Sequence, residues 1–482
     1  MSTRPRVLVI GGGISGLASA HFLAKSGVDV SLVEAADRVG GTIGTDVCEG
    51  FRFERGPNGF LDNQPSTLAL CRSIGLESEL VEASPSAKDR FVFVDGRLQA
   101  LPNHPLKFLR SPILSLRGRV RALLEPFQPA AKDGEEDSVA SFGRRLIGEE
   151  ATLRFLDPMV SGIYAGDIER LSLPSAFPRI AQLERDHGSL IKGMRAKRKE
   201  RRAAELKSGG ANPAGGSSAA ADGGKAKPKG AVGGARLWSL RGGLGDLMDR
   251  LAEGLGDRLR SGTAVEAIAR GENGLNVQIA GGSTESFDAV VLAVPAPRAA
   301  SFCAGLGAEL PGSFESISYA SITVLCLGYR AEDVASDLPG YGFLVPRTEG
   351  LRTLGMIWTS TLFPDHAPGG TKSLRVMFGG ARDPDAIQLS ADDLCELLER
   401  ELGGVLGLAG EPLVRTVYRY AQGIPQYNLG HHRRVESLEA QLGEIPGVFL
   451  CGNAYRGVAL NDCVTRAEAV SVEVCESLGL TP

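Results

Sequence analysis

Residues 6–45, RVLVIGGGISGLASAHFLAKSGVDVSLVEAADRVGGTIGT, decide the fold of this chain. The apolar run Arg6–Ile10 predicts a short buried strand, and residues 15–26 have the apolar spacing of a helix. The glycines between them, Gly11, Gly13 and Gly16, permit a tight turn and let a diphosphate approach the N-terminus of that helix. Residues 28–33 predict the next parallel strand. The stretch therefore predicts a β-α-β unit that binds a dinucleotide.

Glu34 closes the second predicted strand, and its residue type narrows the choice of dinucleotide. A carboxylate at this place suits the hydroxyl pair of a ribose and rejects a 2′-phosphate. Glycines alone also mark ordinary turns, but here strand, turn, helix, strand and acidic residue follow in the required order. The nucleotide is therefore expected to be FAD or NAD, and not NADP.

The composition is that of a globular protein with two or three domains. The 482 residues are 43% hydrophobic and 23% charged, and the net charge of -4 gives no reason to expect a nucleic-acid partner. The 8 cysteines show no CxxC spacing and are expected to be reduced core residues. The 6 histidines lack a ligand pattern, so we expect no metal site, and we expect His431 and His432 to lie in a solvated turn.

The sequence predicts a cytoplasmic protein, because no apolar run is long enough for a bilayer span and the chain enters its first strand without a signal segment. Residues 103–127 have helix-like spacing and leave two interpretations open. Their apolar side chains, near four arginines, could lie on an anionic membrane surface, or could pack on neighbouring helices. The four arginines are Arg110, Arg117, Arg119 and Arg121.

The nucleotide-binding domain is expected to be built from three separated segments, 1–89, 237–298 and 443–482. Residues 258–297 alternate short strands with Gly and Asn turns and end in a buried strand. Residues 447–478 contain a strand, a Gly-containing turn and a long helix. Residues 258–297 also resemble the second FAD-contacting unit of the amine oxidase superfamily, and this resemblance implies that the separated segments form one domain.

Two insertions separate these segments. The first, residues 90–236, begins with a hairpin whose Asp95-Gly96 pair indicates a type I′ turn, and continues as a helical domain. It ends in a basic run, 197–207, and a low-complexity loop, 208–234. The second, residues 299–442, mixes strands with a helix near 391–402 and predicts an α+β domain that forms a substrate wall. The expected fold class is thus α/β and α+β, with a discontinuous Rossmann-like domain.

Further motifs carry a family resemblance. Residues 35–45, AADRVGGTIGT, resemble the end of the FAD-binding signature of amine oxidases, phytoene desaturases and protoporphyrinogen oxidases. FERGPNGFLDNQP (53–65), VSGIYAGDIERLS (160–172), GIPQYNLGH (423–431) and GNAYRGVALNDC (452–463) together resemble the protoporphyrinogen and coproporphyrinogen oxidase family. The resemblance runs from end to end, apart from the low-complexity loop. Amine oxidases and phytoene desaturases share the first signature but not GIYAGD or IPQYN.

The resemblance implies non-covalent FAD, since the cysteine that carries covalent flavin in monoamine oxidases is absent from AQGIPQ (421–426). A helix starting near Leu460 would direct its positive end at the flavin, with Asn461 and Asp462 as its caps. The implied FAD-binding residues are Gly11, Gly13, Ile14, Ser15, Gly16, Glu34, Ala35, Arg38, Gly40, Gly41, Thr42, Gly56, Pro57, Asn58, Val265, Gly452, Asn453, Val458, Ala459 and Leu460.

The resemblance also implies a reaction. It is the oxidation of protoporphyrinogen IX to protoporphyrin IX by three two-electron transfers to FAD, with O2 as acceptor and H2O2 as product. Oxidation of coproporphyrinogen III to coproporphyrin III is the nearest alternative. An amine oxidase-like flavoenzyme and a non-catalytic FAD-binding protein stay open as well. Peripheral membrane contact, a homodimer and delivery of the product to ferrochelatase are further interactions that this function allows.

Six residues are expected to position the substrate, each with a plainer structural alternative. Arg90 matches an arginine that faces a propionate, and Gly162 matches a glycine beside the macrocycle. A surface arginine and a helix-end glycine are the alternatives. Asn58 is expected near the flavin, with an Asx-turn as its alternative. Leu344, Ile357 and Met377 are expected in the apolar wall, with the protein core as their alternative. No side chain in these motifs is an obvious general base.

Overall fold

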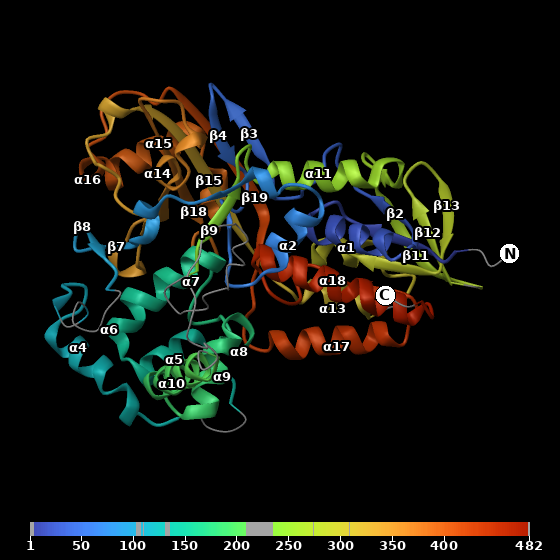
Figure 1. Cartoon of the computed structure of the whole chain (residues 1–482), viewed down its shortest axis with the longest axis horizontal. Coiled ribbons are helices and arrows are strands. Elements are labelled where there is room, and N and C mark those ends of the chain that lie inside the picture. Colours follow the sequence, from blue (N-terminus) through green and yellow to red (C-terminus); the bar gives the residue numbers. More distant parts are fainter. Residues whose placement is uncertain are drawn as a thin grey trace, which may run out of the picture.

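The computed structural model describes residues 4–102, 108, 110–130, 135–208, 235–272, 274–307 and 309–480. Apart from Ser208, the predicted low-complexity loop 208–234 lies outside these residues. Figure 1 shows a parallel sheet with its helices at one end of the molecule, a large mixed sheet at the other, and a helical region below that second sheet. No helix in the described part of the chain combines the length and apolar character that a bilayer span requires.

The first region is built on a five-stranded parallel sheet whose order is β10-β2-β1-β14-β20. Its strands come from three distant segments, as the apolar runs predicted. Both faces of the sheet are covered, so β14 is apolar and buried at every position. The bounds are β1 (Arg6–Ile10), β2 (Asp29–Val33), β10 (Leu259–Arg260), β14 (Ala289–Leu292) and β20 (Val448–Leu450).

Helices pack against both faces of this sheet. One face carries α1 (Ile14–Lys25), α2 (Ser66–Ser73), α11 (Gly245–Leu255) and α18 (Leu460–Ser477). The other carries α12 (Ala296–Phe302), α13 (Leu310–Glu315), α17 (His431–Gly443) and an antiparallel sheet of β11 (Val265–Gly271), β12 (Gly274–Ile279) and β13 (Ser283–Phe287). This arrangement is the expected Rossmann-like domain.

The second region is a seven-stranded sheet of order β19-β15-β18-β17-β16-β7-β8. Alternation decides its faces: in β18, Leu374, Val376 and Phe378 enter an apolar core, while Arg375 and Met377 point the other way. Three helices belong to this region, α14 (Thr359–Leu362), α15 (Ala391–Leu398) and α16 (Gly404–Leu406). The strands are β7 (Phe91–Val94), β8 (Arg97–Ala100), β15 (Tyr319–Arg330), β16 (Gly342–Leu344), β17 (Thr353–Trp358), β18 (Thr371–Gly379) and β19 (Val414–Pro425).

The predicted hairpin is confirmed, with φ of 53° at Asp95 and 72° at Gly96 between β7 and β8. Its location differs from the expectation. β7 pairs in parallel with β16, so the hairpin extends the seven-stranded sheet instead of joining the helices that follow it. The division of the chain at residues 89, 236, 298 and 442 stays a prediction.

The third region is helical, as expected for residues after the hairpin. Its helices are α4 (Leu116–Leu123), α5 (Val139–Leu146), α6 (Glu149–Ala151), α7 (Asp157–Tyr164), α8 (Leu173–Ala176), α9 (Pro178–His187) and α10 (Leu190–Ser208). The basic run 197–207 lies in α10. Short strands link the regions: β3 (Thr45–Cys48) pairs with β4 (Phe51–Glu54), and β9 (Leu237–Leu240) lies between β5 (Phe60–Leu61) and β6 (Leu80–Glu82).

The expectation of a solvated turn at His431 was wrong. His431 begins α17, its side chain is 2% exposed, and its ring stacks on Tyr427 with centroids 4.0 Å apart. Burial lowers the pKa of His431 to about 4, although its Nε2 lies 3.2 Å from the Tyr455 carbonyl oxygen. His432 is exposed and pairs with Glu436. The ring is buried because Tyr427, two residues after the end of β19, covers it.

Candidate active site

The glycines of the first turn have different neighbours, and the difference marks where a diphosphate fits. A Cβ at Gly16 would lie 1.9 Å from the carbonyl oxygen of Gly11, so only glycine allows this helix-strand approach. A Cβ at Gly13 would meet no atom within 4 Å. The backbone at Gly13 therefore faces open space at the N-terminus of α1, as an anion site requires.

A second glycine turn closes over the first. The Gly40 N–H donates to the Gly12 carbonyl oxygen at 2.7 Å. The guanidinium of Arg38 donates to the carbonyl oxygens of Gly41 at 2.7 Å and Val39 at 3.0 Å, which stabilises this turn. Arg38 thus has a structural contact beside the diphosphate contact that the resemblance implies.

The predicted adenosine residues are brought together by backbone pairing. Oε2 of Glu34 accepts from the Gly12 N–H at 2.6 Å, and its backbone carbonyl accepts from the Thr263 N–H at 2.8 Å. Thr263 lies just before β11, so this pairing places Val265 close to Glu34. A carboxylate has about four acceptor positions, which leaves capacity for a ribose.

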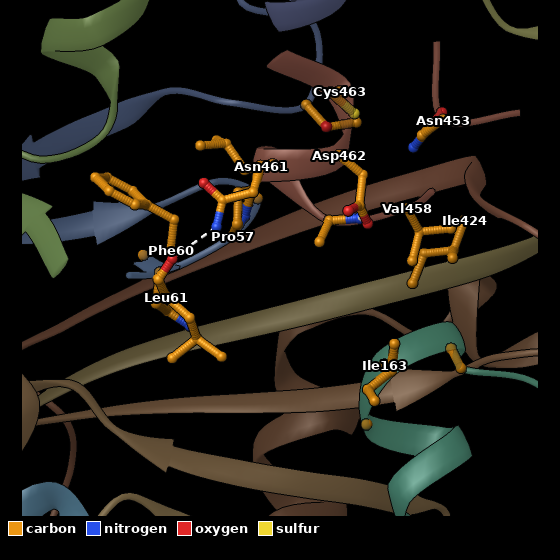
Figure 2. Close-up of a pocket in the computed structure, with 18 of the residues that line it drawn as sticks. Pro57, Phe60, Leu61, Ile163, Ile424, Asn453, Val458, Asn461, Asp462 and Cys463 are labelled. Atoms are coloured by element: carbon orange, nitrogen blue, oxygen red, sulfur yellow. Dashed lines mark hydrogen bonds between the residues drawn. The ribbon is translucent and has the colours of Figure 1, made fainter. Parts of the chain in front are cut away.

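A cavity of about 830 Å³ lies where the three regions meet (Figure 2). Its volume is within the range of ligand pockets. Part of its wall is made of predicted FAD residues: Ile14, Thr42, Gly56, Pro57, Asn58, Asn453, Val458, Ala459 and Leu460. The remaining predicted FAD residues do not line the cavity; they lie in the glycine turns, the first turn of α1, the loops after β2 and β20, and the start of β11.

The first turn of α18 borders this cavity. Oδ2 of Asp462 accepts from the Ala459 N–H at 3.3 Å, so Asp462 caps the helix as expected. Asn461 does not cap it, and that expectation was wrong. Its Nδ2 donates to the Leu61 carbonyl oxygen at 2.6 Å, because β5 lies against the helix start (Figure 2).

Two buried amide oxygens in the cavity wall have no partner in the described protein, Oδ1 of Asn58 and Oδ1 of Asn461. Buried polar atoms in native proteins are nearly always hydrogen-bonded, so these oxygens are suited to a bound polar group. Together with the open space at Gly13, they show that the residues present fit a flavin dinucleotide.

Sequence reasoning missed a buried arginine in the cavity wall. Arg375 lies on the same face of β18 as Met377 and donates to the carbonyl oxygens of Glu54 and, at 2.6 Å, Gly56. The Glu54 carboxylate is also buried, and burial raises its pKa to about 7 despite hydrogen bonds from the Leu244 N–H and the Thr45 hydroxyl. A single arginine within the apolar run SLRVMFGG was the signal that could have revealed it.

The predicted substrate residues meet in the same cavity, with one difference. Arg90, Gly162, Ile357 and Met377 line it. Leu344 lies behind the wall: a Cβ at Gly162 would come within 2.7 Å of the Leu344 Cδ2 atom. The expectation that Leu344 forms the wall surface is therefore corrected, because its side chain fills the space that Gly162 leaves.

Arg90 is exposed and lines the cavity, and its side chain has no hydrogen bond or ion pair with any described residue. Its guanidinium carbon lies 5.2 Å from the centre of the Tyr341 ring, which also lines the cavity. A cation held by an aromatic face, without a carboxylate, is available to a ligand anion.

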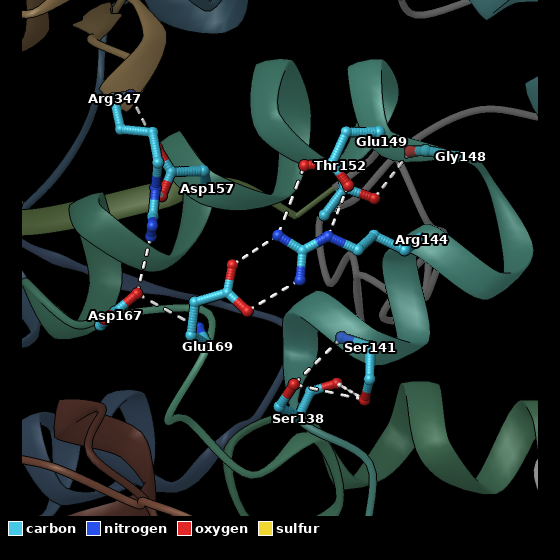
Figure 3. Close-up of polar contacts among 10 residues, drawn as sticks. All are labelled: Ser138, Ser141, Arg144, Gly148, Glu149, Thr152, Asp157, Asp167, Glu169 and Arg347. Atoms are coloured by element: carbon cyan, nitrogen blue, oxygen red, sulfur yellow. Dashed lines mark hydrogen bonds and ion pairs between the residues drawn. The ribbon is translucent and has the colours of Figure 1, made fainter.

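Ion pairs hold the GIYAGD segment in place (Figure 3). The backbone N–H and Nε of Arg347 each donate to the buried carboxylate of Asp157 at 2.7 Å, and its Nη2 donates to Asp167 at 2.7 Å. Arg144 forms further pairs with Glu149 and Glu169. These contacts fix α7, and with it Gly162, against the seven-stranded sheet.

Known proteins resemble this chain over nearly its whole length. The model of the flavin containing amine oxidoreductase family matches residues 14–475. The chain belongs to this family. Its expected FAD cofactor and Rossmann-like fold are thereby confirmed, and it is an oxidoreductase.

Members of the family with assigned substrates are among its relatives. The chain is 31% identical over 484 residues to the coproporphyrinogen III oxidase of Bacillus subtilis (strain 168), covering 97% of each protein. It is 33% identical over 486 residues to the chloroplastic protoporphyrinogen oxidase of Nicotiana tabacum, covering 97% of this chain and 85% of that protein. A crystal structure from Exiguobacterium sp. 255-15, of a protein provisionally named protoporphyrinogen oxidase, matches with a TM-score of 0.79, 25% identity and coverage of 99% and 100%. The resemblance to the protoporphyrinogen and coproporphyrinogen oxidase family is confirmed.

Proposed function

We propose that this flavoprotein oxidises protoporphyrinogen IX to protoporphyrin IX in porphyrin biosynthesis, with O2 as electron acceptor. The observation that carries the proposal is the cavity of about 830 Å³, which joins predicted FAD residues to an apolar wall and to the unpaired Arg90. Three two-electron steps remove six hydrogen atoms from the macrocycle and reduce three O2 to three H2O2. The names of the relatives support a porphyrinogen as the substrate class.

The residues of the chain have distinct tasks in this proposal. Glu34 and Val265 hold the adenosine, Gly13 and Arg38 border the diphosphate, and residues 452–460 hold the flavin ring without a covalent bond. Bound FAD supplies the two-electron redox chemistry.

The substrate side has its own tasks. Ile357 and Met377 contact the macrocycle, the backbone of Gly162 lies beside it, and Arg90 pairs with a propionate. Asp462, an acid in the cavity lining, accepts the Ala459 N–H, so we assign it no proton transfer. The proton of the pyrrole N–H passes to solvent.

Coproporphyrinogen III is the second candidate substrate, and one observation favours it. Arg179, another arginine of the cavity lining, has a side chain without a hydrogen bond or ion pair to any described residue. Two separate cations can pair with more of the carboxylates of a substrate that carries four propionates than of a substrate that carries two. A cytoplasmic location, peripheral membrane contact, a homodimer and delivery to ferrochelatase stay predictions alongside either substrate.

Aerobic turnover of protoporphyrinogen IX and coproporphyrinogen III, compared side by side by porphyrin fluorescence, tests the function. We expect Arg90→Ala to retain FAD and to raise KM for both substrates by about tenfold, because a charged hydrogen bond is lost. Arg97→Ala is the control, since Arg97 is exposed on the same hairpin and does not line the cavity.

Two outcomes would count against this assignment. A yellow protein that oxidises neither porphyrinogen would favour a non-catalytic FAD-binding role, and oxidation of amines in their place would favour an amine oxidase. Unchanged KM in Arg90→Ala would remove Arg90 from the substrate site.

A further inference from the structure

Four arginines line the cavity, and they differ in what already neutralises them. Arg55 pairs with Asp46, with Nη2 and Oδ1 at 2.6 Å. Arg375 donates to two backbone carbonyl oxygens. Arg90 lies over an aromatic ring. The side chain of Arg179 has no hydrogen bond, ion pair or ring contact with any described residue, so its charge is available to a ligand.

The place of Arg179 in its helix is unusual for a cation. It is the second residue of α9, and the first turn of this helix contains no acidic residue. A positive charge there is unfavourable beside the positive end of the helix dipole. A carboxylate at this point would interact favourably with the guanidinium and with the positive end of the helix dipole.

Arg179 and Arg90 approach the cavity from different elements. Arg90 immediately precedes β7 of the seven-stranded sheet, whereas Arg179 belongs to the helical region. Phe177 and Ile180, on either side of Arg179, also line the cavity and offer apolar contacts. The wall near Arg179 can therefore receive either a propionate, through the cation, or a vinyl group, through its neighbours.

We propose that Arg179 is a second carboxylate-binding residue and that it sets the preference between the two porphyrinogens. The proposal rests on the proposed function. Protoporphyrinogen IX carries two propionates, on neighbouring pyrroles, which one cation region can serve. Coproporphyrinogen III carries one propionate on every pyrrole, so a second cation on another wall meets a carboxylate that protoporphyrinogen IX replaces by a vinyl group.

The test compares KM and kcat of the FAD-loaded enzyme for both porphyrinogens in three variants. In Arg179→Gln, KM for coproporphyrinogen III should rise by about tenfold more than KM for protoporphyrinogen IX, while the two kcat values keep their ratio. Arg179→Lys should restore part of the difference, because it restores the charge. Arg185→Gln should match the wild type, since Arg185 is exposed on the same helix and lies outside the cavity lining.

Binding of oxidised coproporphyrin III, followed by fluorescence quenching, gives a second readout. Its affinity should fall in Arg179→Gln, and added salt should weaken wild-type binding more than binding by this variant. Equal FAD content and equal thermal midpoints exclude a folding defect, and Arg179→Lys carries the test if the glutamine variant does not fold.

If Arg179→Gln changes KM equally for both substrates, or changes neither, the proposed role of Arg179 is wrong. The proposed porphyrinogen oxidase function would still stand in that case. A lysine variant no better than the glutamine variant would overturn the role of Arg179 as well. A wild-type enzyme that oxidises neither porphyrinogen would refute the proposed function, and this proposal with it.

Discussion

At the residue scale, substitutions at Gly13 and Gly16 should have different effects, the first on cofactor binding and the second on folding. Gly13 has an extended backbone, with φ of -74° and ψ of 177°, and open space beside it, so we expect Gly13→Ala to fold but to bind FAD about tenfold more weakly. Gly16→Ala places a Cβ against the Gly11 carbonyl oxygen and should lower the unfolding free energy by about 1–3 kcal/mol or more. FAD absorbance and urea denaturation of the apoprotein measure the two effects.

Gly254→Ala is the matched control for this pair, because Gly254 is exposed in α11 and a Cβ there would meet no atom within 4 Å. It should be neutral or slightly stabilising. Full FAD binding by Gly13→Ala would show that the diphosphate does not lie against this backbone.

Glu54 should give the protein a specific pH dependence. Burial raises its pKa from 4.5 to about 7, so the folded state favours the protonated acid. The stability that this preference contributes is fully present below pH 4.5 and is lost as the pH rises through 7. Relative to Glu54→Gln, the wild type should therefore lose about 3 kcal/mol of unfolding free energy across this range. Urea denaturation at a series of pH values measures the difference, and parallel pH profiles would contradict it.

At the scale of elements, Arg347 joins α7 to the segment after β16. Its removal leaves the carboxylate of Asp157, which is 0% exposed, without its cation. We expect Arg347→Ala to lower the unfolding free energy by about 3–5 kcal/mol, as is usual when one partner of a buried pair is lost. Arg352→Ala, which breaks a more exposed pair with Asp383, should cost about 1 kcal/mol or less. Similar losses in the two variants, in urea denaturation, would show that burial of Asp157 is not decisive.

The surface of α4 bears on the two interpretations of residues 103–127, of which 103–107 and 109 lie outside the described residues, and both interpretations stay predictions. Leu116 is 71% exposed and Phe127, just after the helix, is 82% exposed, so these side chains do not pack on neighbouring helices. With Arg117 nearby, they suit an anionic membrane surface. We expect the protein to sediment with phosphatidylglycerol vesicles. The double variant Leu116→Ser, Phe127→Ser should bind these vesicles more weakly, and added salt should weaken binding of the wild type.

Val47→Ser provides the control for vesicle binding, because Val47 is 65% exposed on β3, far from α4 in the fold. It should sediment as the wild type does. Equal sedimentation with phosphatidylcholine vesicles, or none with either lipid, would contradict an electrostatic membrane contact of α4.

At the scale of the whole molecule, the sequence predicted those features that local pattern determines. The glycine turn, Glu34 and the apolar alternation around them predicted β1, α1 and β2, and Asp95-Gly96 predicted its hairpin. The pairing of that hairpin was not predictable in this way. Phe91 lies beside Phe343, and nothing in either strand alone specifies so distant a partner.

The candidate site shows the same limit. Its cofactor half is made of local motifs and was predicted in large part. Arg179, Arg375 and Tyr341 line the cavity because three regions meet there, and no local pattern shows that these three residues come together. Alternation placed Leu344 on the correct strand, but only the contact with Gly162 shows that it lies behind the wall.

The pairing of β14 with β20 has a consequence for biosynthesis of the protein. The ribosome must translate the whole stretch between Val290 and Val448 before these two residues can pair. Until then, the emerging polypeptide exposes an unpaired parallel edge and the apolar residues that β20 and α18 would cover. We therefore expect the flavin site to be complete only after β20 and α18 have been translated.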